Sequence, residues 1–430
     1  MFDQQRILRL NSLQECWRKP MTYRIKGIEM TESSVISGYV KPGFEAVQEA
    51  FVENFEIRNE LGAACCIYYR GEKVVDLWGG IRNEATGEPW EEDTMVLVWS
   101  TTKGLSGLAM ALAHSRGLFG YDEPISKYWP EFAQQGKEKV TVRQLMAHQA
   151  GLFAFDELGD RETIADLDRL AVVLARQKPA WEPGTHHGYH GLTLGFYQSE
   201  LLRRVDLKHR SLGRYFQDEI ATPLGLDFYI RLPEDIPNAR LASLREIKFG
   251  ISALRSAPIG FVLAVMNPRS AARRILVGTE FCLDKDRLYA RNYEVPSGGG
   301  VGTARAIAHA YGVFAAGGKE LGLREETLRE LATPARVPLR GPRDVALGVK
   351  TYYSLGFSKP DPKTTSGPLS PYGMPGTGGS FGFADPQNQI GYGYVLNGLG
   401  TSFPNDPREI ALRTAMYRAI GERDPWLTSR

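Results

Sequence analysis

Ser100 and Lys103 form the only Ser-x-x-Lys pattern in the 430 residues of this chain. The pattern stands where a polar stretch gives way to small and apolar residues, 104–113, which predict a buried helix. Side chains three positions apart on a helix lie on one face, one turn apart. Ser100 and Lys103 should therefore meet at a helix N-terminus, where free backbone N–H groups favour negative charge. A hydroxyl beside an amine that can take its proton indicates nucleophilic catalysis.

The surroundings of Lys103 strengthen this weak motif, which chance alone produces about once in a chain of ordinary composition. Apolar residues 96–99 precede it and the apolar helix follows, so a surface position is disfavoured. Burial lowers the pKa of a lysine because it disfavours the charged form, and a general base near neutral pH needs this. Lys103 is therefore a candidate base.

Two further segments carry polar groups that such chemistry needs. The loop 183–191 (PGTHHGYHG) contains Tyr189, which alone would be read as one of nineteen tyrosines that pack in the core. Residues 372–382 (YGMPGTGGSFG) precede a predicted strand. Glycines at this density let the backbone approach a ligand, and an N–H group there could stabilise an oxyanion.

In this order, the three segments resemble the serine β-lactamase-like superfamily with penicillin-binding-protein architecture, above all family VIII carboxylesterases and class C β-lactamases. The likeness spans roughly residues 36–425 and includes residues 140–152 (VTVRQLMAHQAGL), which are similar to the LLxHxSGL segment of that superfamily. It implies an α+β fold of the β-lactamase/transpeptidase type. An antiparallel sheet flanked by helices would be built from both termini, and a mainly helical domain would be inserted.

The resemblance also implies roles for the site residues. Ser100 would be the acylated nucleophile, and Lys103 and Tyr189 would share the general-base and proton-shuttle work. The N–H groups of Ser100 and Thr377 would form the oxyanion hole, because residues 374–376 (MPG) fall where lactamases carry Lys-Thr-Gly. The other expected contacts to the oxyanion or the substrate are Gly376, Gly378, His190 and Met374.

Departures from the lactamase pattern bear on the substrate. Gly191 replaces the asparagine of Tyr-x-Asn, and Met374 replaces a cation. Without these polar partners a charged β-lactam is disfavoured. We therefore expect a serine carboxylesterase that hydrolyses small, short-chain acyl esters through a Ser100 acyl-enzyme, with no cofactor. The alternatives are an acyltransferase using the same acyl-enzyme, cephalosporin-type β-lactamase activity, and, least expected, a non-catalytic scaffold.

Three other motifs are weaker. Residues 378–382 (GGSFG) match the G-x-S-x-G nucleophile elbow, but a strand follows them and all seven histidines precede Ser380, against the order that fold requires. The histidines within 186–190 are spaced for metal binding, yet the neighbouring glycines indicate a loop, so no metal is expected. Residues 298–302 (GGGVG) lack the lysine of a phosphate-binding loop.

The chain pattern predicts the elements that position these residues. Expected domains are an N-terminal extension, 1–35; a sheet domain, 36–117 with 300–425; and a helical domain, 118–299. The expected strands are 62–69, 73–78, 379–384 and 390–396. The expected helices are 42–59, one from Ser100, 161–176, 195–204, 304–316 with Thr303 as N-cap, and 407–420.

Composition excludes several partner classes. A net charge of +2 gives no reason to expect nucleic acid, and no apolar run approaches the ~18 residues of a membrane span. The first thirty residues lack the apolar core of a secretion signal, which favours a cytoplasmic location. The four cysteines are too few for a disulfide framework, and Cys65 and Cys66 read as buried thiols. The oligomeric state is left open, and the expected partner is a small-molecule ester.

Overall fold

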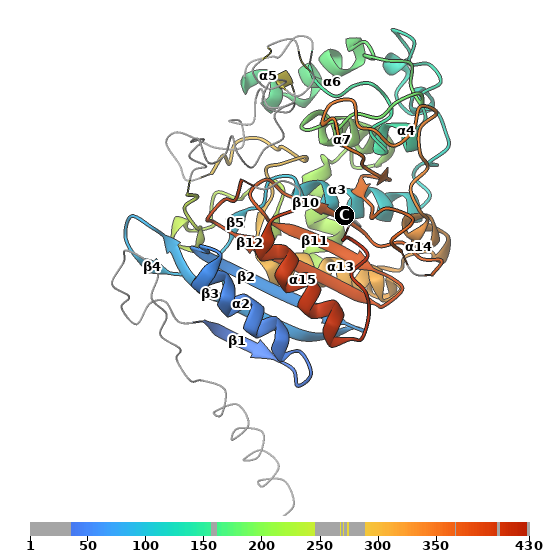
Figure 1. The fold of residues 1–430 in the computed structure, drawn as a ribbon. Coiled ribbons are helices and arrows are strands. Elements are labelled where there is room, and N and C mark those ends of the chain that lie inside the picture. Colours follow the sequence, from blue (N-terminus) through green and yellow to red (C-terminus); the bar gives the residue numbers. More distant parts are fainter. Residues whose placement is uncertain are drawn as a thin grey trace, which may run out of the picture.

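The computed structural model (Figure 1) describes residues 36–155, 161–245, 267, 270, 273–274, 289–365, 367–401 and 405–427. The predicted extension 1–35, and with it Cys16, lies outside these residues, as does Cys282. Cys65 and Cys66 are buried free thiols, as expected. Among the described residues no helix is both long and apolar enough to span a membrane.

A nine-stranded antiparallel sheet joins strands from both ends of the described chain, in the order β1-β3-β2-β12-β11-β10-β9-β8, with β4 paired to β3. The junction is the pairing of β2 with β12, which runs from Ala63 opposite Leu396 to Tyr69 opposite Ile390. The predicted α+β fold is therefore confirmed. The strands are β1 (Ser37–Val40), β2 (Gly62–Tyr69), β3 (Glu72–Asn83), β4 (Glu88–Pro89), β8 (Tyr353–Ser354), β9 (Phe357–Ser358), β10 (Tyr372–Pro375), β11 (Phe381–Asp385) and β12 (Ile390–Leu396).

Helices cover both faces of this sheet (Figure 1). Helices α2 (Glu45–Ile57) and α15 (Pro407–Ala419) pack on one face, and α13 (Ala304–Ala315) packs on the other. Successive side chains of β12 point to opposite faces of the sheet, which lets α13 pack closely on one of them. Tyr392 and Tyr394 join the core under α2 and α15, whereas Gly391 faces α13. A Cβ on Gly391 would lie 2.2 Å from the Gly312 backbone nitrogen, so only glycine fits there.

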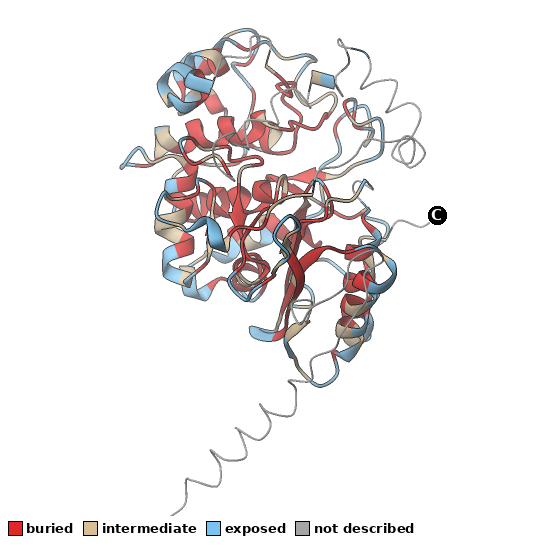
Figure 2. Ribbon diagram, turned by 90° about the vertical axis from the view of Figure 1, so that its left-hand side faces the viewer, coloured by how far each residue is buried: buried red, intermediate tan, exposed pale blue. Residues whose placement is uncertain are grey.

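Helix α3 (Thr101–Ser115) is buried along its whole length. Figure 2 shows that buried residues fill the middle of the molecule and that exposed ones lie at its outer edges. Helix α3 contacts the sheet through β10 and β11, and α7 and α8 on its other side. Gly104 allows this packing, because a Cβ there would lie 1.8 Å from the Tyr311 hydroxyl of α13. The remaining helical elements are η2 (Ile125–Lys127), η3 (Pro130–Phe132), α4 (Val142–Met146), α5 (Arg161–Ala165), α6 (Leu167–Arg176), α7 (Thr193–Val205), α8 (Leu212–Phe216), η4 (Gln217–Ala221), α9 (Thr222–Leu224), η5 (Asn238–Arg240), η7 (Lys319–Leu321) and α14 (Glu325–Ala332).

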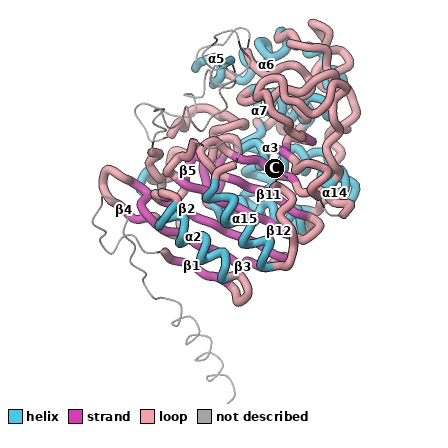
Figure 3. The backbone as a smooth tube through the Cα atoms, viewed as in Figure 1, coloured by secondary structure: helices cyan, strands magenta, loops and turns pink. Residues whose placement is uncertain are grey.

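A small second sheet places the start of α3. Its strand order is β5-β7-β6, formed by β5 (Val96–Leu97), β7 (Val301–Gly302) and β6 (Phe228–Tyr229). Strand β5 leads directly into Ser100, and Val98 extends the pairing by donating its N–H to Gly300 O at 2.9 Å. Figure 3 draws the backbone as a tube coloured by secondary structure, in which β5 is labelled near α3.

Most predicted elements match the structure within a few residues. Strands β2 and β12 have the predicted bounds, and Thr303 caps α13 by accepting from Ala306 N. Strand β3 continues past residue 78 to Asn83, β11 begins two residues later than predicted, and the 161–176 pattern divides into α5 and α6 at Asp166. Short strands β1 and β8–β10 and helix α14 were not predicted. The domain boundaries at 118 and 299 stay a prediction.

Candidate active site

Ser100 stands at the N-cap of α3, after a sharp turn of the chain. Trp99 has a φ of +48°, a left-handed conformation that is unusual for a bulky residue. The turn closes with Thr101 N donating to Val98 O and Thr102 N to Trp99 O. Ser100 is half-buried, whereas every residue of α3 behind it is buried. The turn therefore presents the Ser100 hydroxyl at the end of an otherwise enclosed helix.

Lys103 lies one turn further along, fully buried. Its Nζ donates to Ser100 Oγ at 3.2 Å and to Ser297 O at 2.7 Å. It also lies 4.8 Å from the centre of the Tyr189 ring. The structure thus brings together Ser100, Lys103 and Tyr189, which are separated by up to 89 positions in the sequence. Burial of an amine requires such partners, because an unsatisfied polar group in the interior is costly.

The carbonyl of Ser297 was not among the predicted site residues. The Ser297 side chain accepts a hydrogen bond from Gly195 N at 2.6 Å. This bond attaches the turn that contains Ser297 to α7. The neighbouring Pro296 O accepts from Ser106 of α3. The segment had been interpreted only as a glycine turn, and no residue type in it marks a backbone carbonyl as a lysine partner.

Tyr189 is held through its backbone rather than its hydroxyl. Its N–H donates to the Asp344 carboxylate at 3.0 Å. The hydroxyl is buried and has no hydrogen-bond partner of normal geometry among the described residues. Burial raises the pKa of Tyr189, and the nearby Ser100 hydroxyl lowers it in part. The phenol is thus positioned next to Ser100 and remains available to exchange a proton.

His190, an expected substrate contact, has both ring nitrogens hydrogen-bonded to the protein backbone. Its Nδ1 lies 2.6 Å from Gly188 O and its Nε2 accepts from Leu152 N at 3.0 Å, so the proton must be on Nδ1. Burial lowers the pKa of His190 to about 3, which keeps the ring neutral. Its own N–H donates to His148 Nδ1 at 2.9 Å. Both ring nitrogens are occupied by the backbone, and His190 therefore acts as a strut that shapes the Tyr189 loop.

The glycine-rich turn after β10 lies against the turn before Ser100. A Cβ on Gly376 would lie 2.3 Å from Val98 O, so a larger residue would separate the two turns. Gly376 N donates to Ser380 O, and Gly376 O accepts from Gly379 N at 3.2 Å. Because a trans peptide directs its N–H opposite to its C=O, the Thr377 N–H points out of the turn. Neither this N–H nor that of Ser100 has a hydrogen-bond partner among the described residues.

Ser380 is not placed as a nucleophile. Its side chain is buried and its hydroxyl donates to Val98 O at 2.9 Å. The Thr101 hydroxyl lies 3.1 Å from Ser380 Oγ and completes the bridge. The Ser380 hydroxyl therefore joins the two turns, and the alternative interpretation of residues 378–382 as a nucleophile elbow is wrong.

Met374 contributes an apolar wall beside Tyr189. It is buried on β10 in a cluster with Phe153, Ala154 and Tyr353. Phe153 and Ala154 also line a hollow of about 210 Å³, and Ser100, Lys103 and Tyr189 do not line it. The other lining residues are Gly151, Gln177, Lys178, Pro179, Ala180 and Arg274. Among the described residues no group of three or more His, Cys, Asp or Glu side chains could hold a metal ion.

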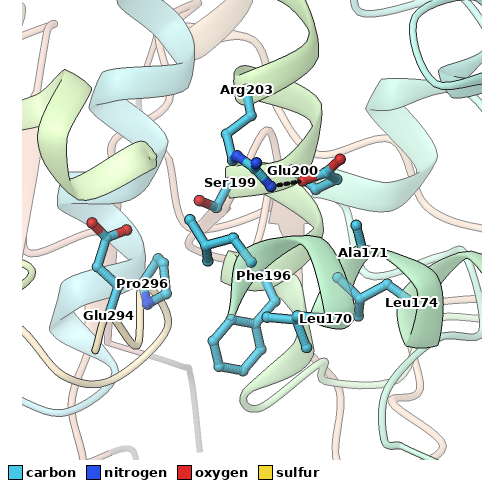
Figure 4. Close-up of a pocket in the computed structure, with 10 residues that line it drawn as sticks. Leu170, Ala171, Leu174, Phe196, Ser199, Glu200, Arg203, Glu294 and Pro296 are labelled. Carbon is cyan, nitrogen blue, oxygen red and sulfur yellow. Dashed lines mark hydrogen bonds and ion pairs between the residues drawn. The ribbon is translucent and has the colours of Figure 1, made fainter. Parts of the chain in front are cut away.

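A second hollow does not belong to this site. It lies between α6 and α7, where Leu170, Phe196 and Pro296 line it and Arg203 pairs with Glu200 at 2.8 Å (Figure 4). Its volume of about 10 Å³ has room for one water molecule at most. It is a packing gap and not a substrate pocket.

We expect the Asp344 carboxyl to make folding stability depend on pH. Burial raises its pKa from 3.8 to about 6, although three backbone N–H groups donate to it. The folded protein therefore binds this proton more tightly than the unfolded chain, and the stability contribution falls as pH rises from about 4 to about 6. The unfolding free energy of the wild type minus that of Asp344→Asn should fall by up to about 3 kcal/mol across this window, measured by urea titration at each pH.

If the unfolding free energies of the wild type and Asp344→Asn change with pH in parallel, Asp344 does not have this raised pKa. The difference between them is the quantity to measure, because every other titrating group is common to both proteins.

Comparisons with known proteins assign the chain to a family. The profile of the Beta-lactamase family matches residues 47–415. The Esterase/beta-lactamase LipL of Mycobacterium tuberculosis (strain ATCC 25618 / H37Rv) is 32% identical over 377 residues, covering 85% of this chain and 83% of that protein. The crystal structure of a family VIII carboxylesterase superimposes with a TM-score of 0.75 at 34% identity, covering 89% of this chain and 99% of the other.

A penicillin-binding-protein homologue from Caulobacter crescentus gives the same TM-score of 0.75 at 32% identity, with 89% and 99% of the two chains covered. The resemblance to the β-lactamase-like superfamily is thereby confirmed. The chain belongs to the Beta-lactamase family, with family VIII carboxylesterases among its structural neighbours, and is a serine hydrolase.

Proposed function

We propose that this protein is a carboxylesterase that hydrolyses small, uncharged, short-chain acyl esters through an acyl-enzyme on Ser100. The observation that carries the proposal is the contact of the buried Lys103 amine with Ser100 Oγ, beneath the Tyr189 ring. A stable fold does not require a serine, a lysine and a tyrosine in this arrangement, whereas nucleophilic catalysis requires an activated hydroxyl.

In this mechanism Lys103 and Tyr189 together accept the Ser100 proton while Oγ attacks the ester carbonyl. The carbonyl electron pair moves onto its oxygen and forms a tetrahedral intermediate. When this collapses, Tyr189 returns the proton to the leaving alcohol and the acyl group remains on Ser100. Water, which gives a proton to the same pair, then attacks the acyl-enzyme. The bond between Ser100 Oγ and the acyl carbon breaks, the pair returns the proton to Oγ, and the acid is released. No cofactor takes part.

The N–H groups of Ser100 and Thr377 would bind the oxyanion. Both are unpaired in the described structure, and they come from adjoining turns. Such donors act because they are already oriented, and each typically accelerates the step by about 10²- to 10³-fold. Gly376 and Gly378 serve here through the backbone, since they let the turn approach Ser100.

The apolar wall supports an uncharged substrate. Met374 offers no charge to a substrate carboxylate and lies in an apolar cluster with Tyr189. A second candidate is hydrolysis of a cephalosporin-type β-lactam, because the relative from Mycobacterium tuberculosis is named as both esterase and β-lactamase. The same acyl-enzyme would serve both substrates, and also acyl transfer to an alcohol.

Ser100→Ala should abolish activity and covalent labelling together. The wild type should gain one fluorophosphonate adduct by intact-protein mass and hydrolyse p-nitrophenyl acetate, whereas Ser100→Ala should do neither. Lys103→Ala should lower kcat/KM by about 10³-fold or more, since the base is lost. Ser380→Ala is the matched control, and this variant should still gain the fluorophosphonate adduct on Ser100.

Labelling that survives in Ser100→Ala would sink the mechanism. A folded wild type that is neither labelled nor active would indicate a scaffold. Turnover of a cephalosporin at a kcat/KM similar to that of the ester would favour the second candidate.

Arg408, at the start of α15, holds the glycine-rich turn from behind. Its Nη2 donates to Gly378 O at 3.1 Å and its Nη1 to Gly398 O at 2.7 Å. Its charge is balanced by Glu60, at 3.0 Å, and by Asp406, at 2.8 Å, and all three side chains are buried. The turn that carries the Thr377 N–H is thereby fixed before substrate arrives.

Arg408→Lys should therefore lower kcat by about tenfold or more with KM changed less than about threefold, because a misplaced oxyanion donor affects the transition state and not binding. Arg413 is the matched control: it is equally buried on α15 between Glu409 and Asp424, with no hydrogen bond to the turn. Arg413→Lys should lose comparable stability but keep kcat. Equal kcat values per folded molecule in the two variants would contradict this role.

A further inference from the structure

Exposed apolar side chains are concentrated in one loop. Four of the nine large apolar side chains that are exposed in the described chain lie between Val337 and Val349. Leu339 is 86% exposed, and Val345 completes the four. We call residues 336–350 the apolar loop. The other five are scattered, at Tyr39, Ile57, Val172, Leu207 and Leu427. Single exposed apolar residues are ordinary, whereas a cluster indicates a contact surface.

Basic side chains alternate with these apolar ones. The apolar loop contains four exposed cations, and its one acid, Asp344, is buried and turned toward the Tyr189 backbone. Only one of the cations has an ion-pair partner in the described chain, a 3.6 Å contact of Arg336 with Asp122. The exposed cations are Arg336, Arg340, Arg343 and Lys350. The surface is thus both apolar and positive.

The apolar loop is anchored at the rim of the active site. Leu339 N donates to Gly184 O at 3.1 Å and Arg340 N to Thr185 O at 2.9 Å. Val345 N donates to His187 O at 3.0 Å. These acceptors lie on the segment that leads into Tyr189, so whatever the apolar loop binds is brought next to the catalytic tyrosine. In Figure 1 the orange loops of this part of the chain run beside α4 and α7.

We propose that the apolar loop docks this enzyme onto an anionic lipid–water interface. Aliphatic side chains flanked by Arg and Lys suit such an interface, where the aliphatic groups enter the acyl boundary and the cations meet lipid phosphates. As a consequence, and resting on the proposed esterase function, the substrate would be an acyl ester drawn from the interface.

The test measures binding separately from catalysis. Full-length Ser100→Ala protein is sedimented with sucrose-loaded vesicles of phosphatidylcholine containing phosphatidylglycerol, and with vesicles of phosphatidylcholine alone. We expect binding to the anionic vesicles that weakens with added salt. Leu339→Asp in this background should lower the partition coefficient at least tenfold. Leu207→Asp is the matched control, because Leu207 is 94% exposed beside Lys208 but lies elsewhere, and should change it less than twofold.

A charge pair separates headgroup attraction from the apolar contact. Arg340→Glu should weaken binding at low salt, whereas Arg329→Glu, which makes the same change of charge on α14, should not. In the protein that retains Ser100, Leu339→Asp should hydrolyse soluble p-nitrophenyl acetate at the wild-type rate.

Several results would overturn the proposal. The first is no binding to anionic vesicles, and the second is an equal loss of vesicle binding in Leu339→Asp and Leu207→Asp. The third is a dimer in sedimentation velocity that Leu339→Asp dissociates, which would assign the loop to a second copy of the chain. Vesicle binding uses the Ser100→Ala protein, so a failed esterase assay leaves this test intact, and failed vesicle binding leaves the esterase mechanism intact.

Discussion

The burial of the Lys103 amine is the constraint on which the site depends. An amine without water around it must find its partners in the protein, and these are the Ser100 hydroxyl, the Ser297 carbonyl and the face of the Tyr189 ring. Each partner comes from a different segment, so satisfying one side chain joins α3, the turn before β7 and the loop before α7. The same arrangement holds the amine 3.2 Å from Ser100 Oγ, as the proposed proton transfer requires.

A second layer of contacts holds the backbone around this centre. The Val98 carbonyl receives the Ser380 hydroxyl, and the Gly376 turn lies directly on it, so the two turns with free N–H groups cannot move independently. Arg408 fixes the far side of the same turn through Gly378 O. Buried charges contribute little net stability but strongly penalise disruption. This makes them suited to hold the proposed oxyanion donors, which must be oriented before the substrate binds.

The sequence predicted the parts of this structure that local pattern controls. Thr303 followed by an apolar helix and two glycines has a defined start and stop, and α13 begins at the predicted residue and ends one residue earlier than predicted. The Ser-x-x-Lys spacing on a helix also placed two side chains correctly. The sequence did not reveal Ser297 or Arg408, because a backbone carbonyl has no residue signature and because Arg408 meets Glu60 across 348 positions. The sequence also did not reveal that the ring nitrogens of His190 bind the carbonyl of Gly188 and the N–H of Leu152.

The distribution of charge around the site connects chemistry with substrate. Where lactamases of this type hold a cation, this chain places Met374 in an apolar cluster with Tyr189. Four exposed cations stand on the apolar loop, whose backbone is hydrogen-bonded to Gly184 and His187 ahead of Tyr189. A cation in the cleft would select a carboxylate on the substrate itself, whereas cations at the rim act on whatever surface presents the substrate. An apolar cluster beside Tyr189 and a positive loop bonded to the segment before it are what a neutral ester taken from a negatively charged interface would require.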